Sequence, residues 1–135
     1  SLAALEVAAE NARRLDARVQ FVAGDISTCF AARSFDLVAS NPPYVSHGEA
    51  AGLQPEVREH EPHVALFAGP TGNEIYARLV ADARRVLMPG GWLIMELGYR
   101  SLDAVRAMFG GAWDSLHTRQ DLAGYPRVIA ARYKP

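Results

Sequence analysis

Residues 35–44, which read FDLVASNPPY, give the strongest indication of the fold of this chain. The first five of them, Phe35 to Ala39, are apolar almost throughout, and the run stops at Asn41-Pro42-Pro43. A continuous apolar run predicts a strand buried on both faces, as in a parallel sheet covered by helices. A polar corner directly after such a strand lies where open α/β sheets bind their ligands.

Helical and strand patterns alternate on both sides of this stretch. Apolar residues at spacings of three and four predict a helix from Leu2 to Leu15, and residues 19–23 predict a short strand that ends at Gly24-Asp25. The later elements are predicted in this order: a long connection over 46–73 with a short helix near 56–61, a helix over 75–87, a strand over 92–97, a helix over 102–109, and strands over 115–119 and 128–133. This order predicts an α/β fold with a doubly wound, mostly parallel sheet and a C-terminal antiparallel hairpin.

Composition narrows the class of protein. The chain has 135 residues, of which 50% are hydrophobic and 21% charged, so we expect one globular domain over residues 1–135. Its single cysteine, Cys29, excludes an internal disulfide and a cysteine-cluster zinc site. A formal net charge of -1 disfavours binding to a phosphate backbone. No apolar run is long enough for a membrane span and no secretory signal is visible, which predicts a cytoplasmic protein.

The corner Asn41-Pro42-Pro43-Tyr44 carries the chemistry. Each proline fixes its own φ and holds the preceding residue extended, so the carbonyls are aimed predictably. The Asn41 side-chain oxygen and the Pro42 carbonyl can accept both hydrogens of one planar NH₂ group, and Tyr44 can lie against its plane. Such acceptors stabilise the positive charge that develops when the nitrogen attacks a methyl donor, and they set it in line for attack. We therefore predict that Asn41, Pro42 and Tyr44 are catalytic and that Pro43 completes the substrate-binding corner; the alternative is a plain turn.

Further segments extend the pattern beyond the corner: Val22-Ala23-Gly24-Asp25, Glu61-Pro62 with Ala65-Leu66, Gly69, Gly72, Leu87-Met88-Pro89-Gly90-Gly91, and Asp121-Leu122-Ala123-Gly124 with Arg127-Val128. With them the chain resembles, over essentially all 135 residues, the release factor glutamine methyltransferases, which are the HemK/PrmC group of class I methyltransferases. The resemblance implies a Rossmann-like fold and places the chain in the C-terminal part of the catalytic domain. The corner alone is also shared with DNA adenine and rRNA guanine amino-methyltransferases.

This resemblance implies transfer of a methyl group from S-adenosylmethionine to the glutamine amide of a Gly-Gly-Gln loop in a peptide chain release factor. It further implies that Asp25 and Ile26 bind the cofactor, with Asp25 accepting from the adenine amino group. Asn41 would contact both cofactor and substrate and, with the Pro42 carbonyl, would hold the glutamine amide. Tyr44 would flank that amide, and Glu61 would shape the substrate loop.

The family's glycine-rich cofactor loop and the acidic strand end that grips the ribose do not occur within residues 1–135. We therefore expect a sheet that lacks its first strands, and either a longer polypeptide or a neighbouring chain that completes it. Two alternatives remain: an amino-methyltransferase acting on DNA adenine or rRNA guanine, and a non-catalytic binding module with the same fold. His47, His60 and His63 with nearby glutamates suggest a metal site, but a solvated polar loop explains them equally well, and no metal is predicted.

Overall fold

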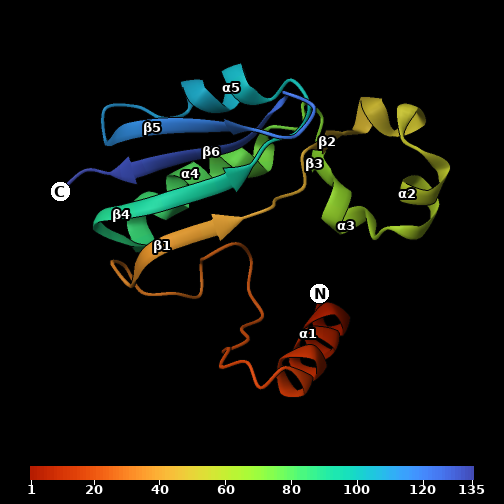
Figure 1. Cartoon of the computed structure of the whole chain (residues 1–135), viewed down its shortest axis with the longest axis horizontal. Helices are drawn as coiled ribbons and strands as arrows, with labels where there is room; N and C mark the ends of the chain where they lie inside the picture. Colours follow the sequence, from red (N-terminus) through yellow and green to blue (C-terminus); the bar gives the residue numbers. More distant parts are fainter.

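The computed structural model describes residues 1–135 and contains a four-stranded sheet with the strand order β1-β4-β6-β5. The strands are β1 (Phe35–Ser40), β4 (Leu87–Glu96), β5 (Trp113–Gln120) and β6 (Pro126–Tyr133). β1 is parallel to β4, and β6 is antiparallel to both of its neighbours (Figure 1). The α/β class and the C-terminal hairpin are confirmed, and because the hairpin supplies two of the four strands the sheet is mixed.

One face of the sheet carries the core. α4 (Glu74–Val86) buries Tyr76, Leu79, Val80 and Ala83, which recur at the helical spacings of three and four. These side chains meet every second residue of β4, Leu93, Met95 and the following Leu97, and all three are fully buried. α5 (Leu102–Ala107) adds Val105 to the same cluster. None of the helices combines the length and the apolar character that crossing a bilayer requires.

β4 begins earlier than expected. Leu87 already pairs with Phe35, after which the segment from Met88 to Gly91 departs from the regular ladder and Leu37 pairs with Trp92. The predicted helix over 75–87 and the predicted strand over 92–97 are therefore both present, and a short irregular stretch joins them. α5 ends at Ala107, two residues before its predicted end.

The connection between β1 and α4 contains several short elements. They are β2 (Val45–Ser46), the 3-10 helix η1 (His47–Gly52), α2 (Pro55–His60), α3 (His63–Leu66) and β3 (Phe67–Gly69). β2 and β3 form a two-stranded parallel sheet, and the short helix expected near residues 56–61 is confirmed as α2. Figure 1 shows this group beside the ends of β1 and β4 toward which their arrows point.

The N-terminal segment agrees only partly with the sequence pattern. α1 (Leu2–Arg14) is a helix capped by the side chain of Ser1, but it buries no residue and lies apart from the sheet (Figure 1). The predicted strand over residues 19–23 is wrong: these residues form no strand, and Val19 and Val22 are 55% and 48% exposed. A strand persists only where a neighbour accepts and donates its backbone hydrogen bonds, and no strand pairs with this segment.

The predicted burial of β1 on both faces is also wrong. Leu37 is 52% exposed, and Asp36 and Ala39 are exposed as well. β1 is an edge strand, and Leu37 pairs with Trp92, whose side chain is half-buried on the face opposite the core. The apolar run is real, but helices of this chain cover only one side of it.

Candidate active site

The predicted corner lies at the carboxyl end of β1, where the chain leaves the sheet for β2. Asn41 is exposed, Pro42 is buried, and Pro43 and Tyr44 are half-buried. β1 and β4 run parallel with Ser40 opposite Met95, so the residues that follow both strands lie at the same edge of the sheet. The end of β4 is therefore a neighbour of the corner.

The hydroxyl of Tyr44 is held by the end of β4. It donates a hydrogen bond to Oε1 of Glu96 over 3.2 Å. Burial raises the pKa of Tyr44, the negative charge and hydrogen bond of Glu96 raise it further, and Arg127 opposes the shift. Tyr44 therefore stays protonated at neutral pH, and its neutral hydroxyl donates to Glu96 and can still accept a hydrogen bond.

Two further side chains hold the end of β4. The Tyr76 hydroxyl donates to the carbonyl of Glu96 over 2.9 Å and accepts from the backbone N–H of Gly98 over 3.0 Å. Burial is the main cause that raises the pKa of Tyr76 to about 12. Nη1 of Arg127 donates to the carbonyl of Leu97 over 2.9 Å. The backbone of residues 96–98 is thus tied to both α4 and β6.

Two glycines allow the chain to approach Tyr44 closely. A Cβ atom built on Gly98 would lie 2.6 Å from Cδ2 of the Tyr44 ring. A Cβ on Gly72, which has a φ of +81°, would lie 2.6 Å from the backbone oxygen of Tyr44. Larger residues at either position would displace Tyr44.

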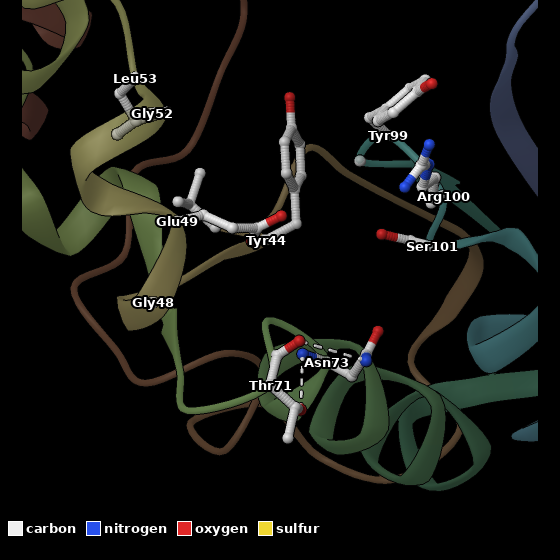
Figure 2. A pocket seen from close by; sticks show the side chains of 12 residues that line it. Tyr44, Gly48, Glu49, Gly52, Leu53, Thr71, Asn73, Tyr99, Arg100 and Ser101 are labelled. Atoms are coloured by element: carbon white, nitrogen blue, oxygen red, sulfur yellow. Dashed lines mark hydrogen bonds between the residues drawn. The ribbon is translucent and has the colours of Figure 1, made fainter.

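A cavity of about 700 Å³ opens beside Tyr44. Figure 2 shows the Tyr44 ring between Glu49 and Leu53 on one side and the turn from Tyr99 to Ser101 on the other. The complete lining is Tyr44, Val45, Gly48, Glu49, Gly52, Leu53, Thr71, Asn73, Gly98, Tyr99, Arg100 and Ser101. The cavity offers hydroxyl, amide, carboxylate and guanidinium groups, which suits a polar, peptide-like ligand.

A second cavity of about 340 Å³ follows β1 and is mostly apolar. It is lined by Ile26, Ser27, Phe30, Leu79 and the β1 residues Phe35, Leu37, Val38, Ala39 and Ser40. Ser40 lines this cavity and Tyr44 lines the first. The corner Asn41-Pro42-Pro43 therefore connects the two cavities along the chain.

The predicted cofactor residues lie on the side of the second cavity. Ile26 lines that cavity and has a φ of +56°, which is rare for a β-branched residue. Asp25 is 69% exposed and forms an ion pair with Arg78 of α4. Its carboxylate keeps further acceptor positions, because two oxygens offer about four lone pairs.

The predicted substrate residues are only partly brought together. Asn41, Pro42 and Pro43 line neither cavity. The residues on either side of them do, because Ser40 lines the second cavity and Tyr44 lines the first. Glu61 is exposed directly after α2 and lines neither cavity, and its charge is the last of the causes that raise the pKa of Tyr44. Of the histidines considered as metal ligands, His47 and His63 pack against the ring of Phe67 at 5.8 and 5.3 Å between ring centroids.

Sequence reasoning missed Glu96, Gly98 and Tyr76. A signal for the first two was present, because Glu96-Leu97-Gly98 ends a predicted strand, and ligand sites of open sheets collect at such ends. Tyr76 carried no comparable signal, since a Tyr on the apolar stripe of a helix reads simply as core.

Comparison with known proteins finds release factor glutamine methyltransferases from several organisms. The chain is 42% identical over 130 residues to the release factor glutamine methyltransferase of Koribacter versatilis, covering 96% of this chain and 46% of that protein. It is 44% identical over 138 residues to that of Nitratidesulfovibrio vulgaris, covering 98% of this chain and 47% of the relative. The chain thus spans about half the length of these relatives. No protein-family model matches it.

A solved structure supports the fold. The crystal structure of a methyltransferase from Pyrococcus furiosus superimposes with a TM-score of 0.66 over 96% of this chain and 57% of that one, at 19% sequence identity. At this identity the likeness concerns the fold alone. Together with the relatives that share about two residues in five, it leads to one conclusion: over nearly its whole length this chain is similar to about half of the release factor glutamine methyltransferases, and it shares its fold with a solved methyltransferase.

Proposed function

We propose that this chain carries the methyl-acceptor site of an enzyme that methylates the glutamine side-chain amide in the Gly-Gly-Gln loop of a peptide chain release factor. The observation that carries the proposal is the corner Asn41 to Tyr44, at the carboxyl end of β1, with Tyr44 held by Glu96 beside a large polar cavity. Relatives that bear this enzyme's name match nearly the whole chain, which supports the same substrate class.

The chemistry follows from the acceptors at the corner. A carboxamide nitrogen is a weak nucleophile because its lone pair is delocalised into the carbonyl. The Asn41 side-chain oxygen and the Pro42 carbonyl accept its two N–H groups and stabilise the positive charge that grows on the nitrogen as it attacks. Pro42 is buried, so its carbonyl is fixed in place and no dipole has to reorient during the reaction. As the N–C bond forms, the bond between the methyl carbon and the donor's sulfur would break and the donor would leave as a neutral thioether. The nitrogen then releases one proton to water.

S-adenosylmethionine would supply the electrophilic methyl group. Two features fit its adenine: the second cavity is mostly apolar with Ile26 in its wall, and the carboxylate of the preceding residue, Asp25, can accept from an amino group. The two cavities, one lined by Ser40 and the other by Tyr44, support a site in which Asn41 lies between the cofactor and the acceptor amide.

The full-length protein, a labelled methyl donor and a bacterial release factor provide the direct test. We expect label on the release factor, located by peptide mass spectrometry at the glutamine of its Gly-Gly-Gln loop. A release factor with that glutamine replaced by alanine is the matched substrate control and should stay unlabelled. A DNA duplex and an rRNA fragment are incubated in parallel; label on a nucleic acid would reject the proposal. Cofactor binding without label on any substrate would instead support a binding module. We also propose that the protein is located in the cytoplasm.

A further inference from the structure

We propose that Glu96 is a positioning residue of this site: its carboxylate fixes the orientation of the Tyr44 ring, and through that ring the place of the acceptor amide. The inference rests on the proposed function, because it assigns Tyr44 to the substrate. Glu96 itself does not line the cavity beside Tyr44. It therefore acts through the tyrosine rather than on the substrate.

The Tyr44 ring needs such a restraint. Pro42 and Pro43 fix the backbone that leads to it, but they leave the two side-chain torsions free. On one side the ring lies against Gly98, and on another a cavity of about 700 Å³ gives it room to turn. The hydrogen bond from its hydroxyl to Glu96 holds the far end of the ring, so contacts at both ends define a single orientation.

Glu96 is well suited to hold another side chain because its own backbone is immobilised. Its carbonyl accepts from Tyr76, and the carbonyl of the next residue, Leu97, accepts from Arg127. Glu96 also lies within the ladder between β4 and β6, opposite Val128. A group supported by a regular strand is placed more accurately than one on a loop.

An ionised carboxylate is a stronger partner for this hydroxyl than a neutral acceptor. The charged and titratable groups that act on Tyr44 are Glu96 from β4, Arg127 from β6, Glu61 after α2 and Tyr76 from α4. Among the charges, that of Glu96 has the largest effect on the pKa of Tyr44. The contact therefore has a signature that can be measured apart from activity.

Steady-state kinetics of the full-length enzyme test the role in positioning. Glu96→Gln keeps an acceptor oxygen, and we expect kcat within about threefold of wild type, whereas Glu96→Leu removes the acceptor and should lower kcat by about tenfold. The same Glu96→Leu change made in a Tyr44→Phe background should cost little more, because the hydroxyl is already gone. Glu56→Leu, an exposed site on α2, is the matched control and should match wild type. An equal loss from Glu96→Leu with and without the Tyr44 hydroxyl would overturn the proposal.

Nuclear magnetic resonance provides the readout that does not depend on turnover. Tyrosine labelled with ¹³C at Cζ reports the titration of each ring, and Tyr44→Phe identifies the signal of Tyr44. In Glu96→Gln the Tyr44 signal should titrate at a lower pH than in wild type, because a negative neighbour has been removed. An unchanged titration would overturn the proposal even if Glu96→Leu failed to fold. If the wild-type enzyme methylates no release factor, the proposed function fails, while this titration still decides whether Glu96 holds Tyr44.

Discussion

At the scale of single residues, the corner combines one exposed polar group with a buried anchor. Asn41 is exposed and Pro42 beside it is buried, so the amide side chain can reach a ligand while its backbone is held by packing. Two consecutive prolines predict a stiff backbone at this corner, whereas the burial of Pro42 depends on the packing around it.

Replacing Asn41 by Ala removes one of the two acceptors for the developing charge. We expect turnover by the full-length enzyme to fall by about a hundredfold or more, with unchanged stability because the side chain is exposed. Kinetics and thermal unfolding measure the two effects separately. Asn11→Ala, on the exposed surface of α1, is the control. A folded Asn41→Ala enzyme with near-normal turnover would rule out the mechanism.

Replacing Gly98 by Ala places a methyl group against the Tyr44 ring. The new Cβ would lie 2.6 Å from Cδ2, closer than atoms can pack, so the ring must move. We expect a loss of stability of about 1–3 kcal/mol and a marked fall in kcat. Gly110→Ala is the matched control, since nothing lies within 4 Å of its added Cβ. The free energy of unfolding in urea and kcat are measured for both variants. Equal values for Gly98→Ala and Gly110→Ala would contradict the close contact between Gly98 and Tyr44.

At the scale of elements, the hairpin of β5 and β6 supports the site from one side. Arg127 at the start of β6 reaches the carbonyl of Leu97 at the end of β4 and pairs with Asp121 in the turn over 3.1 Å. Asp121 also accepts from the backbone N–H groups of Ala123 and Tyr125. The turn, the hairpin and the end of β4 therefore form one connected unit.

Arg127→Ala should break this unit. We expect a loss of about 1–3 kcal/mol in the free energy of unfolding, because hydrogen bonds to a charged group are lost, together with a lower kcat. Arg132→Ala is the comparison: Arg132 pairs with Asp114 across the same two strands but far from the corner, so its loss should leave kcat unchanged. Unfolding by urea and turnover are measured for both. A normal kcat in Arg127→Ala would show that the hairpin does not support the site.

The turn also predicts a dependence of stability on pH. The backbone hydrogen bond from Tyr125, with further help from Arg127 and Ala123, lowers the pKa of Asp121 below its ordinary 3.8. The ionised side chain therefore stabilises the fold fully above that value, and its contribution is lost as the pH falls through the lowered pKa. Between pH 5 and about 2, the urea midpoint of the wild type should fall more than that of Asp121→Asn. Parallel curves would mean that Asp121 contributes nothing.

At the scale of the whole molecule, the chain exposes more surface than a compact protein of the same mass. Its accessible surface is 8934 Å², whereas a compact protein of this mass exposes about 6,900 Å². α1 buries no residue, and Leu37 on β1 lies on a sheet face that no helix of this chain covers.

Residues 1–135 by themselves should bind S-adenosylmethionine negligibly and transfer no methyl group. They contain neither a glycine-rich turn after a strand nor an acidic partner for the ribose, which leaves Asp25 and the corner as polar anchors. Each tenfold loss of affinity corresponds to about 1.4 kcal/mol, so losing two or three anchors weakens binding by several orders of magnitude. Calorimetric titration of residues 1–135, with the full-length protein as the control, measures this. Micromolar binding by residues 1–135 would contradict the prediction.

Features that depend on neighbouring residues could be predicted from the sequence. Apolar spacing was enough to predict α4, the order of the elements predicted the β5–β6 hairpin, and the two prolines located the corner at the end of β1. Helical periodicity and proline stiffness act over a few residues, so they can be read directly along the chain.

Contacts between residues far apart in the sequence became visible only in the folded chain. The contact of Tyr44 with Glu96 joins residues 52 positions apart, and it exists because β1 and β4 run parallel with a particular register. The same dependence explains the errors: residues 19–23 form no strand because no strand pairs with them, and β1 is exposed because helices cover one face only. Strand pairing and the burial of a sheet face depend on segments far away in the sequence, so they cannot be predicted from a local pattern of residues.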